Sequence, residues 1–349
     1  MTLQELYNKI INLNEAEIFY KNFHKLKEDK IELQKLINSI DSDFLKRNYI
    51  RLDIIDDESA HKFEEDWFFI PELNNDILLQ KHNCYNPPFC HYHNFFEMIY
   101  VLDGECNNVV SNYPLHMTAG DLCIIPPNIK HTISVFDEKS IVINILIKNS
   151  TFEDIFFNLL RSNNILSSFF LNNIYSKKIN DYIIFHTNKD KDLSSLIMDL
   201  FLEYENKSRY YREVLNSQLI SFFARMLRRY ENNCELPPSF KKGDMKSLEL
   251  IRYMHDNYQN ITLNSVAEEF HYTPQHTSRL IKSTTGYTYT QLLKEIRLER
   301  AKSLLRDTSI TIQDICTNVG YLNPEHFIRT FKRDYGMTPS EYRRIQIKP

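Results

Sequence analysis

Four residues in the first half of the sequence have the types and the spacing of a ligand-binding cluster. His91, His93 and Glu97 lie at even separations, and His131 follows further along the chain. Because successive side chains on an extended strand point to opposite faces, the first three would share one face of a single strand. Imidazole nitrogens and a carboxylate are suitable ligands for divalent transition metals. The pattern therefore predicts a pocket for a metal ion or a small polar molecule.

Short strands are expected to position this cluster. Between about residues 66 and 147, apolar or alternating runs are interrupted by Pro, Asn and Asp-Gly, which is typical of consecutive strands. The expected strands are Trp67–Ile70, Phe95–Leu102, Leu122–Ile125 and Ile141–Ile147. Asp103-Gly104 is in addition a signal for a tight hairpin.

Segments 91–104 and 120–131 resemble the two sequence motifs of the cupin barrel. The metal-ligand positions of that family are filled here by His91, His93, Glu97 and His131. One departure is Asn128, which stands where the second motif usually has glycine. The resemblance implies a small β-barrel, and three interpretations of its interior stay open: a divalent transition metal site, a pocket for an organic or anionic effector, and a structural polar core.

The C-terminal third of the sequence contains an internal repeat. Segments 273–282 and 323–332 share the positions of Pro, His, Arg and Lys, and segments 263–272 and 312–321 share their apolar positions. Each copy predicts a short helix, a tight turn and a second helix that opens with an N-cap Thr or Asn followed by Pro. This is the layout of a helix-turn-helix unit, in which the second helix enters the major groove of DNA. An accidental repeat in a helical bundle is the alternative.

Residues 245–345 resemble the DNA-binding domain of the AraC/XylS-type regulators. Segment 297–305 is similar to the helix that links the two units in that family, and segments 312–321 and 327–343 are similar to its signature. The departures are conservative: Cys316, Tyr321 and His326. By position, the resemblance implies base contacts from Gln275, Ser278, Arg279, Pro324, Glu325, Ile328 and Arg329, and phosphate contacts from Lys282, Lys332 and Arg333.

These side chains match the chemistry of base recognition to different degrees. An arginine such as Arg279 can pair with guanine, Gln275 can pair with adenine, and Glu325 can accept a hydrogen bond from cytosine N4. Pro324 offers only an apolar contact. For Arg279 and Arg329, a solvated helix face with no role in binding is the alternative.

The remaining segments are expected to be helical. Residues 14–40 have helical periodicity, and segment 209–230 carries one apolar stripe that consists of Val214, Leu215, Leu219, Phe222, Phe223 and Met226. The stripe is either a dimer interface or ordinary core. Segment 231–243, with two prolines and a glycine, is a linker candidate.

The expected fold class is therefore α+β and multidomain, with a cupin-like β-barrel, flanking helices and an all-α domain that holds two helix-turn-helix units. The domains are an N-terminal helical segment (1–60), a barrel sensor domain (61–150), a helical dimerisation region (151–232), a linker (233–244) and the DNA-binding domain (245–349).

Composition bounds the setting in which the protein acts. The net charge is −4, but from residue 241 onward 17 Lys and Arg stand against 12 Asp and Glu, which suggests an anionic partner for this third. No apolar stretch is long enough to span a bilayer, the N-terminus lacks the features of a signal peptide, and the six cysteines form no C-x-x-C pair. We expect a cytoplasmic protein with reduced thiols and no membrane partner.

Two classes of function are weighed. The first is a non-enzymatic, sequence-specific transcription regulator. The resemblance to the AraC/XylS-type regulators implies that it is an activator. Its partners would be double-stranded promoter DNA, RNA polymerase, a small-molecule effector and a second copy of the chain. The alternative is a metal-dependent cupin enzyme with a helical appendage. A basic domain with paired recognition helices has no catalytic purpose, which favours the regulator.

Overall fold

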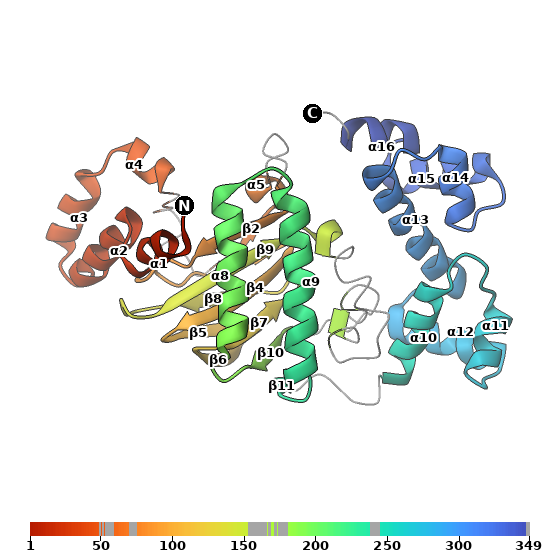
Figure 1. Cartoon of the computed structure of the whole chain (residues 1–349), viewed down its shortest axis with the longest axis horizontal. Helices are drawn as coiled ribbons and strands as arrows, with labels where there is room; N and C mark the ends of the chain where they lie inside the picture. The colour runs from red at the N-terminus through yellow and green to blue at the C-terminus, as the bar shows by residue number, and fades with distance from the viewer. Residues whose placement is uncertain are drawn as a thin grey trace. The chain divides into compact units, whose positions relative to one another are not determined.

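The computed structural model describes residues 1–48, 50, 52, 59–69, 75–152, 166, 169–170, 173, 181–237 and 245–346 of the 349-residue chain. The chain divides into two units, the first of residues 1–155 and 181–237 and the second of residues 156–180 and 238–349. Figure 1 shows the elements of each unit. No helix within the described ranges is both long and apolar enough to cross a membrane.

The first unit begins with four short helices: α1 (Leu3–Ile11), α2 (Glu15–Leu26), α3 (Lys30–Asn38) and α4 (Ser42–Arg47). Thr2 and Asn14 form capping boxes at the starts of α1 and α2, and Asp29 caps α3. The expected helical segment 14–40 is therefore two helices, because the Asp29 side chain accepts from the backbone of the next turn and starts a new helix. Phe19, Tyr20 and Phe23 form their shared core.

The strands of the first unit form two sheets. One sheet has the order β1 (His61–Phe63), β3 (His91–His93), β8 (His131–Ser134), β5 (Glu105–Val110) and β6 (Tyr113–Thr118). The other has the order β11 (Cys234–Glu235), β10 (Ile183–His186), β7 (Asp121–Ile125), β4 (Phe96–Asp103), β9 (Ile141–Ile147) and β2 (Ile77–Lys81). Apolar side chains of both sheets, among them Val110 and Ile133 of one and Ile99 and Cys123 of the other, share one interior cluster. The two sheets thus enclose a barrel-like core.

Three expectations about this region are wrong. The segment at Trp67 is a helical turn, α5 (Glu65–Phe68), and not a strand, since Glu64 and the following acidic residues open a helix; residue 70 lies outside the described ranges. Asp103-Gly104 is not a hairpin, because β4 and β5 belong to different sheets. The hairpin turn lies instead between β5 and β6, at Ser111 and Asn112, which both have positive φ.

The third correction concerns the strand that carries the cluster. His91 and His93 lie on β3 of one sheet, whereas Glu97 lies on β4 of the other. The chain crosses between the sheets at residues 94 and 95. The three side chains still face one interior, because the inner faces of both sheets look toward each other.

Two long helices, α8 (Lys191–Asn206) and α9 (Tyr211–Tyr230), pack against one another and lie over the six-stranded sheet (Figure 1). Tyr100 of β4 joins them through a 2.9 Å hydrogen bond to Ser194 and an edge contact with Phe222. The apolar stripe of α9 is buried in this core, apart from Val214, which is exposed. Those buried side chains are therefore core, and a dimer interface on α9 would need its other face.

The second unit is helical in its described part. Its helices are α10 (Met245–Asp256), α11 (Leu263–Glu269), α12 (Pro274–Thr285), α13 (Tyr289–Asp307), α14 (Ile312–Asn318), α15 (Pro324–Tyr335) and α16 (Pro339–Gln346). One apolar cluster contains side chains of α10, α11, α12 and the first half of α13. A second apolar cluster contains side chains of α14, α15, α16 and the second half of α13. The long helix α13, which includes the linking segment 297–305, thus connects two small cores and runs between the two groups of shorter helices (Figure 1). The expected linker 233–244 lies partly outside the described residues, and its described start forms strand β11 of the first unit. The segment 151–232, expected to be helical, likewise contains strand β10 of the same sheet.

Candidate functional site

The two predicted recognition helices are α12 and α15, and their ends follow from local sequence. Thr273 and Asn323 cap them with side-chain hydrogen bonds to the first turn, and proline occupies the first helical position of each. Gly286 and Gly336 end them in the left-handed conformation. The repeat seen in the sequence is therefore also a structural repeat.

Each recognition helix buries one face and exposes the other. Thr277 and Ile281 of α12, and Phe327 and Phe331 of α15, point into the two cores. Of the ten predicted DNA-contacting residues, those that the structure leaves exposed are Gln275, Arg279, Lys282, Glu325, Arg329, Lys332 and Arg333. The other three, Ser278, Pro324 and Ile328, are half-buried. Ile328 packs partly against the second core, so only part of its side chain is open to a partner.

The basic side chains on the exposed face differ in whether they form ion pairs within the protein. Arg279, Lys282, Arg329 and Lys332 make no ion pair with any residue in the described ranges, whereas Arg333 bonds to the adjacent Asp334 at 3.2 Å. Exposed cations that lack a protein partner are suited to an anionic one. The structure therefore leaves a basic face on both recognition helices.

Arg297 on α13 connects the two helix-turn-helix units, a role that the sequence did not indicate beyond its place in the linking helix. Its guanidinium donates to the carbonyls of Tyr258 at 2.9 Å and Gln259 at 3.0 Å, and lies over the ring of Tyr321. Gln259 in turn donates to the carbonyl of Asn318, at the end of α14. These contacts tie the segment before the first helix-turn-helix to the turn of the second helix-turn-helix.

The turn before each recognition helix requires a left-handed residue. This residue is His271 in the first helix-turn-helix, with a φ of 55°, and Gly320 in the second helix-turn-helix, with a φ of 81°. A Cβ on Gly320 would overlap the carbonyl oxygen of Gln259, so glycine is required there for space as well as for conformation.

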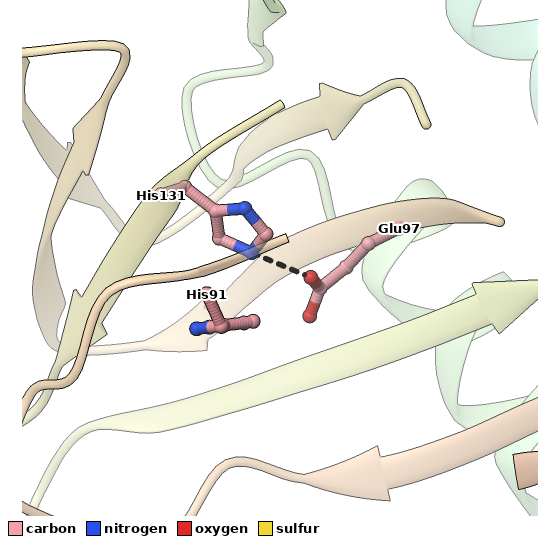
Figure 2. Close-up of side chains that lie close together, drawn as sticks. All are labelled: His91, Glu97 and His131. Carbon is pink, nitrogen blue, oxygen red and sulfur yellow. Dashed lines mark hydrogen bonds and ion pairs between the residues drawn. The ribbon is translucent and has the colours of Figure 1, made fainter. Parts of the chain in front are cut away.

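The second candidate site lies inside the barrel, where the structure brings together all four predicted residues. Glu97 Oε2 lies 3.0 Å from His93 Nε2 and 2.9 Å from His131 Nε2. His91 is paired with His131 across strands β3 and β8, and the ligand atoms of His91, Glu97 and His131 all lie within 4.8 Å of one another. Figure 2 shows these three side chains converging, with the bond from His131 to Glu97. All four residues are buried.

Backbone contacts set the protonation of the histidine rings. The Nδ1 atoms of His91, His93 and His131 face the carbonyl oxygens of Phe89, Phe95 and Ile129 at 3.2, 2.8 and 3.0 Å. A carbonyl can only accept, so each Nδ1 carries a proton and a neutral ring has its lone pair on Nε2. At His93 and His131 that lone pair would face a carboxylate oxygen. Either protons or a metal cation between these Nε2 atoms and Glu97 would satisfy the contact.

Burial shifts the ionisation of the cluster. Desolvation holds the pKa of His91 well below its ordinary value, and the neighbouring His131 lowers it further. Burial alone would raise the pKa of Glu97, but hydrogen bonds from His131 and His93 outweigh it and hold that pKa well below the usual range. The pocket thus combines an ionised carboxylate with at least one neutral imidazole, which is the state in which both groups bind metals.

The donor set fits a divalent transition metal. Imidazole nitrogens and a carboxylate suit zinc, iron, copper and nickel, and a metal-bound histidine commonly donates its other N–H to a backbone carbonyl, as all three do here. The turn that the cupin motif usually builds with glycine is also kept, since Asn128 adopts a φ of 65°. Its backbone N–H donates to the carbonyl of His93 at 2.6 Å.

Comparison with known proteins identifies both parts of the chain. Residues 266–345 match the helix-turn-helix domain family, and residues 82–223 match the AraC-like ligand binding domain family. The chain belongs to the AraC/XylS-type regulators. These matches span the recognition helices and the barrel, and they agree with the expected fold class.

Several members of the AraC/XylS family resemble the chain. The transcriptional activator RhaS of Escherichia coli is 23% identical over 261 residues, which are 72% of this chain and 86% of RhaS. The bifunctional transcriptional activator and DNA repair enzyme AdaA of Bacillus subtilis is 33% identical over 111 residues, or 31% of this chain and 53% of AdaA. The chain spans between 12% and 53% of the length of AdaA and two further curated relatives. A crystal structure of ToxT from Vibrio cholerae has 16% identity and a TM-score of 0.35, and covers 78% of this chain and 98% of ToxT.

Proposed function

We propose that this protein is a sequence-specific DNA-binding transcription regulator whose DNA binding or activity responds to a ligand in the barrel. The observation that carries the proposal is the pair of capped recognition helices, each with an exposed arginine, Arg279 or Arg329, that has no ion-pair partner among the described residues. Two recognition helices in one domain fit successive major grooves, which lie about 34 Å apart. A metal-dependent enzyme would have no use for such a domain, so we infer a non-enzymatic role.

The partners of the regulator follow from this assignment. We infer that it binds promoter DNA in the cytoplasm, acts on RNA polymerase as an activator and assembles as a homodimer. The AraC-like ligand binding domain match over residues 82–223 supports a small-molecule effector. Because the stripe of α9 is core, the dimer contact would lie on other surfaces of the first unit.

The DNA-binding role is tested with the full-length chain. A preferred site is selected from a random duplex library, and binding to it and to a scrambled duplex is measured by fluorescence anisotropy. Arg279→Ala is expected to weaken binding to the selected site by about 1–3 kcal/mol and to relax sequence preference. As a matched control, Arg209→Ala changes an exposed arginine of the first unit and should leave the affinity unchanged. An equal loss on selected and scrambled DNA would contradict base reading by Arg279.

A metal ion is the second candidate for the barrel ligand, or for part of it, because two imidazole Nε2 atoms converge on the carboxylate oxygen Glu97 Oε2 at 3.0 and 2.9 Å. His91, His93, Glu97 and His131 would hold it, and the metal would supply a Lewis-acidic centre for an effector. Elemental mass spectrometry of protein purified without chelator or nickel resin tests this. One metal per chain, lost in His131→Ala but kept in His116→Ala, an exposed histidine of β6, would support the site. Absence of metal from the wild type would leave the cluster to protons and an organic effector.

A further inference from the structure

A second set of polar side chains lies inside the barrel, beside the histidine and glutamate cluster. Asn108 on β5 is 1% exposed and sits between the inward-facing Cys106 and Val110. Neither the nitrogen nor the oxygen of its amide has a hydrogen-bond partner among the described residues. A buried amide without partners costs a few kcal/mol, so such a side chain is rare and requires a reason.

The strand registers place Asn108 one inward-facing position from the level of His131, and a second amide, Asn144, one inward-facing position from the level of Glu97. Across β5 and β8, Val110 pairs with His131 and Asn108 pairs with Ile133. Across β4 and β9, Glu97 pairs with Leu146, and Asn144 pairs with Ile99. Each asparagine is therefore one inward-facing position beyond the level of the cluster, and the two come from opposite sheets.

Asn144 and His82 add further unpartnered atoms to this layer. Asn144 Nδ2 donates to Glu97 Oε1 at 2.9 Å, which leaves Asn144 Oδ1 buried without a partner within the described ranges. His82 Nε2 is also buried without a hydrogen-bond partner among the described residues. The His82 backbone N–H donates to the carbonyl of Val142, which lies on the same strand as Asn144. Burial lowers the pKa of His82 to about 4, against the opposing charges of Glu97 and Glu17, so the ring is neutral at pH 7.

The charge of the interior restricts what can bind there. The buried polar residues in the described part of the chain include no lysine or arginine. An anion in this layer would therefore have no lysine or arginine among those residues to pair with. A neutral group with both a donor and an acceptor would instead satisfy the two amides and the imidazole.

We propose that Asn108, Asn144 and His82 form a subsite for an uncharged group that both donates and accepts hydrogen bonds, a hydroxyl or a primary amide, carried by the effector. The proposal rests on the ligand-responsive function proposed above. It narrows the effector from organic or anionic molecules in general to those that present a neutral polar group to this layer.

Acetamide and acetate test this subsite as isosteric probes, one neutral and one anionic. Binding of each to the full-length, chelator-treated chain is measured by ligand-observed saturation-transfer NMR. Acetamide is expected to bind about tenfold or more tightly than acetate, because the described buried residues include no lysine or arginine to pair with the anion. Asn108→Leu should abolish acetamide binding. Asn107→Leu, which alters the neighbouring outward-facing side chain, should preserve it.

Thermal unfolding of the ligand-free variants gives a readout that needs no probe. Because Asn108→Leu removes two unpartnered polar atoms from an apolar surrounding, it is expected to raise the melting temperature of the first unit. No acetamide binding to the wild type, equal binding of acetate, or unchanged acetamide binding in Asn108→Leu would overturn the subsite. So would a lowered melting temperature, which would make Asn108 a structural residue.

DNA binding by the same samples separates the two proposals. If the wild type binds its selected DNA site and the probe results are negative, only the subsite is wrong. If the wild type binds no DNA, the proposed regulator is wrong, whatever the probes do.

Discussion

Replacing Gly320 by alanine tests the close contact that joins the two helix-turn-helix units. Gly320 has a φ of 81°, and an added Cβ would overlap the carbonyl oxygen of Gln259 and lie 2.9 Å from Gln259 Cα. The chain offers a matched control in Gly336, which has a φ of 75° and no atom within 4 Å of the position of a Cβ. Both substitutions carry the same conformational penalty, and only the first carries a clash.

The expected magnitudes follow from these two terms. A non-glycine residue in the left-handed region costs about 1–2 kcal/mol, and forcing an extra carbon against packed backbone adds about 1–3 kcal/mol. We therefore expect Gly336→Ala to lower stability by about 1–2 kcal/mol and Gly320→Ala by about 2–5 kcal/mol. The excess should appear around Gln259 and Arg297, because the overlapped atom is the carbonyl that Arg297 binds.

Amide hydrogen exchange in the full-length chain measures this difference locally, from peptides that cover Gln259, Arg297 on α13, and α14, with urea unfolding as a global check. Faster exchange in Gly320→Ala than in Gly336→Ala is the expected result. Equal losses in the two variants would refute the reasoning, since the close approach of Gly320 to Gln259 would then have no energetic consequence.

Three further predictions concern contacts that the structure revealed. Arg297→Met removes two charged hydrogen bonds to the carbonyls of Tyr258 and Gln259 and should destabilise the helical unit by about 2–3 kcal/mol in urea unfolding. No loss of stability would mean that these bonds do not hold the two helix-turn-helix units together. Lys81→Met leaves the fully buried Glu17 without its cation and should lower the free energy of unfolding by about 3–5 kcal/mol in urea unfolding. The control Lys62→Met removes an exposed pair with Glu64 and should lower it by less than about 1 kcal/mol. Similar losses in the two variants would contradict the burial of Glu17. Burial lowers the pKa of His255 to about 4, so the unfolded chain, with a pKa of about 6.5, takes up the proton first, and the stability of the helical unit should fall by about 3 kcal/mol as the pH falls from 6.5 to 4. Unfolding measured across this range should lose the slope in His255→Gln but keep it in His271→Gln, an exposed histidine, and a slope unchanged in His255→Gln would assign it to other groups.

Local sequence was sufficient for the helical unit. Its helices begin at side chains such as Thr273 and Asn323, followed by proline, and end at Gly286 and Gly336. These signals act over one helical turn, so they can be read without knowing what a helix packs against. The repeated pattern then predicted two helix-turn-helix units, and the comparisons confirmed the family and the helix-turn-helix assignment.

The barrel was predicted less well, because strand pairing is not local. The sequence identified His91, His93, Glu97 and His131 as one cluster, but it placed the first three on one strand, whereas the structure distributes them over two sheets. The alternation of side chains predicts which face of a strand points inward and does not reveal which sheet the strand joins. The hairpin expected at Gly104 was wrong for the same reason.

The sequence by itself indicated the four cluster residues and the repeat, from the spacing of their motifs. It also indicated the ends of the recognition helices, because their capping residues act within one helical turn. The tertiary structure alone decided that the α9 stripe is core, that Arg297 joins the two helix-turn-helix units and that Asn108 and Asn144 are buried with unpartnered amide atoms on two different sheets. A polar residue between Cys106 and Val110 in an alternating strand was the one local sign of the second polar layer. Its meaning depended on strands that come together only in the folded chain, where the absence of a partner for a buried amide becomes visible.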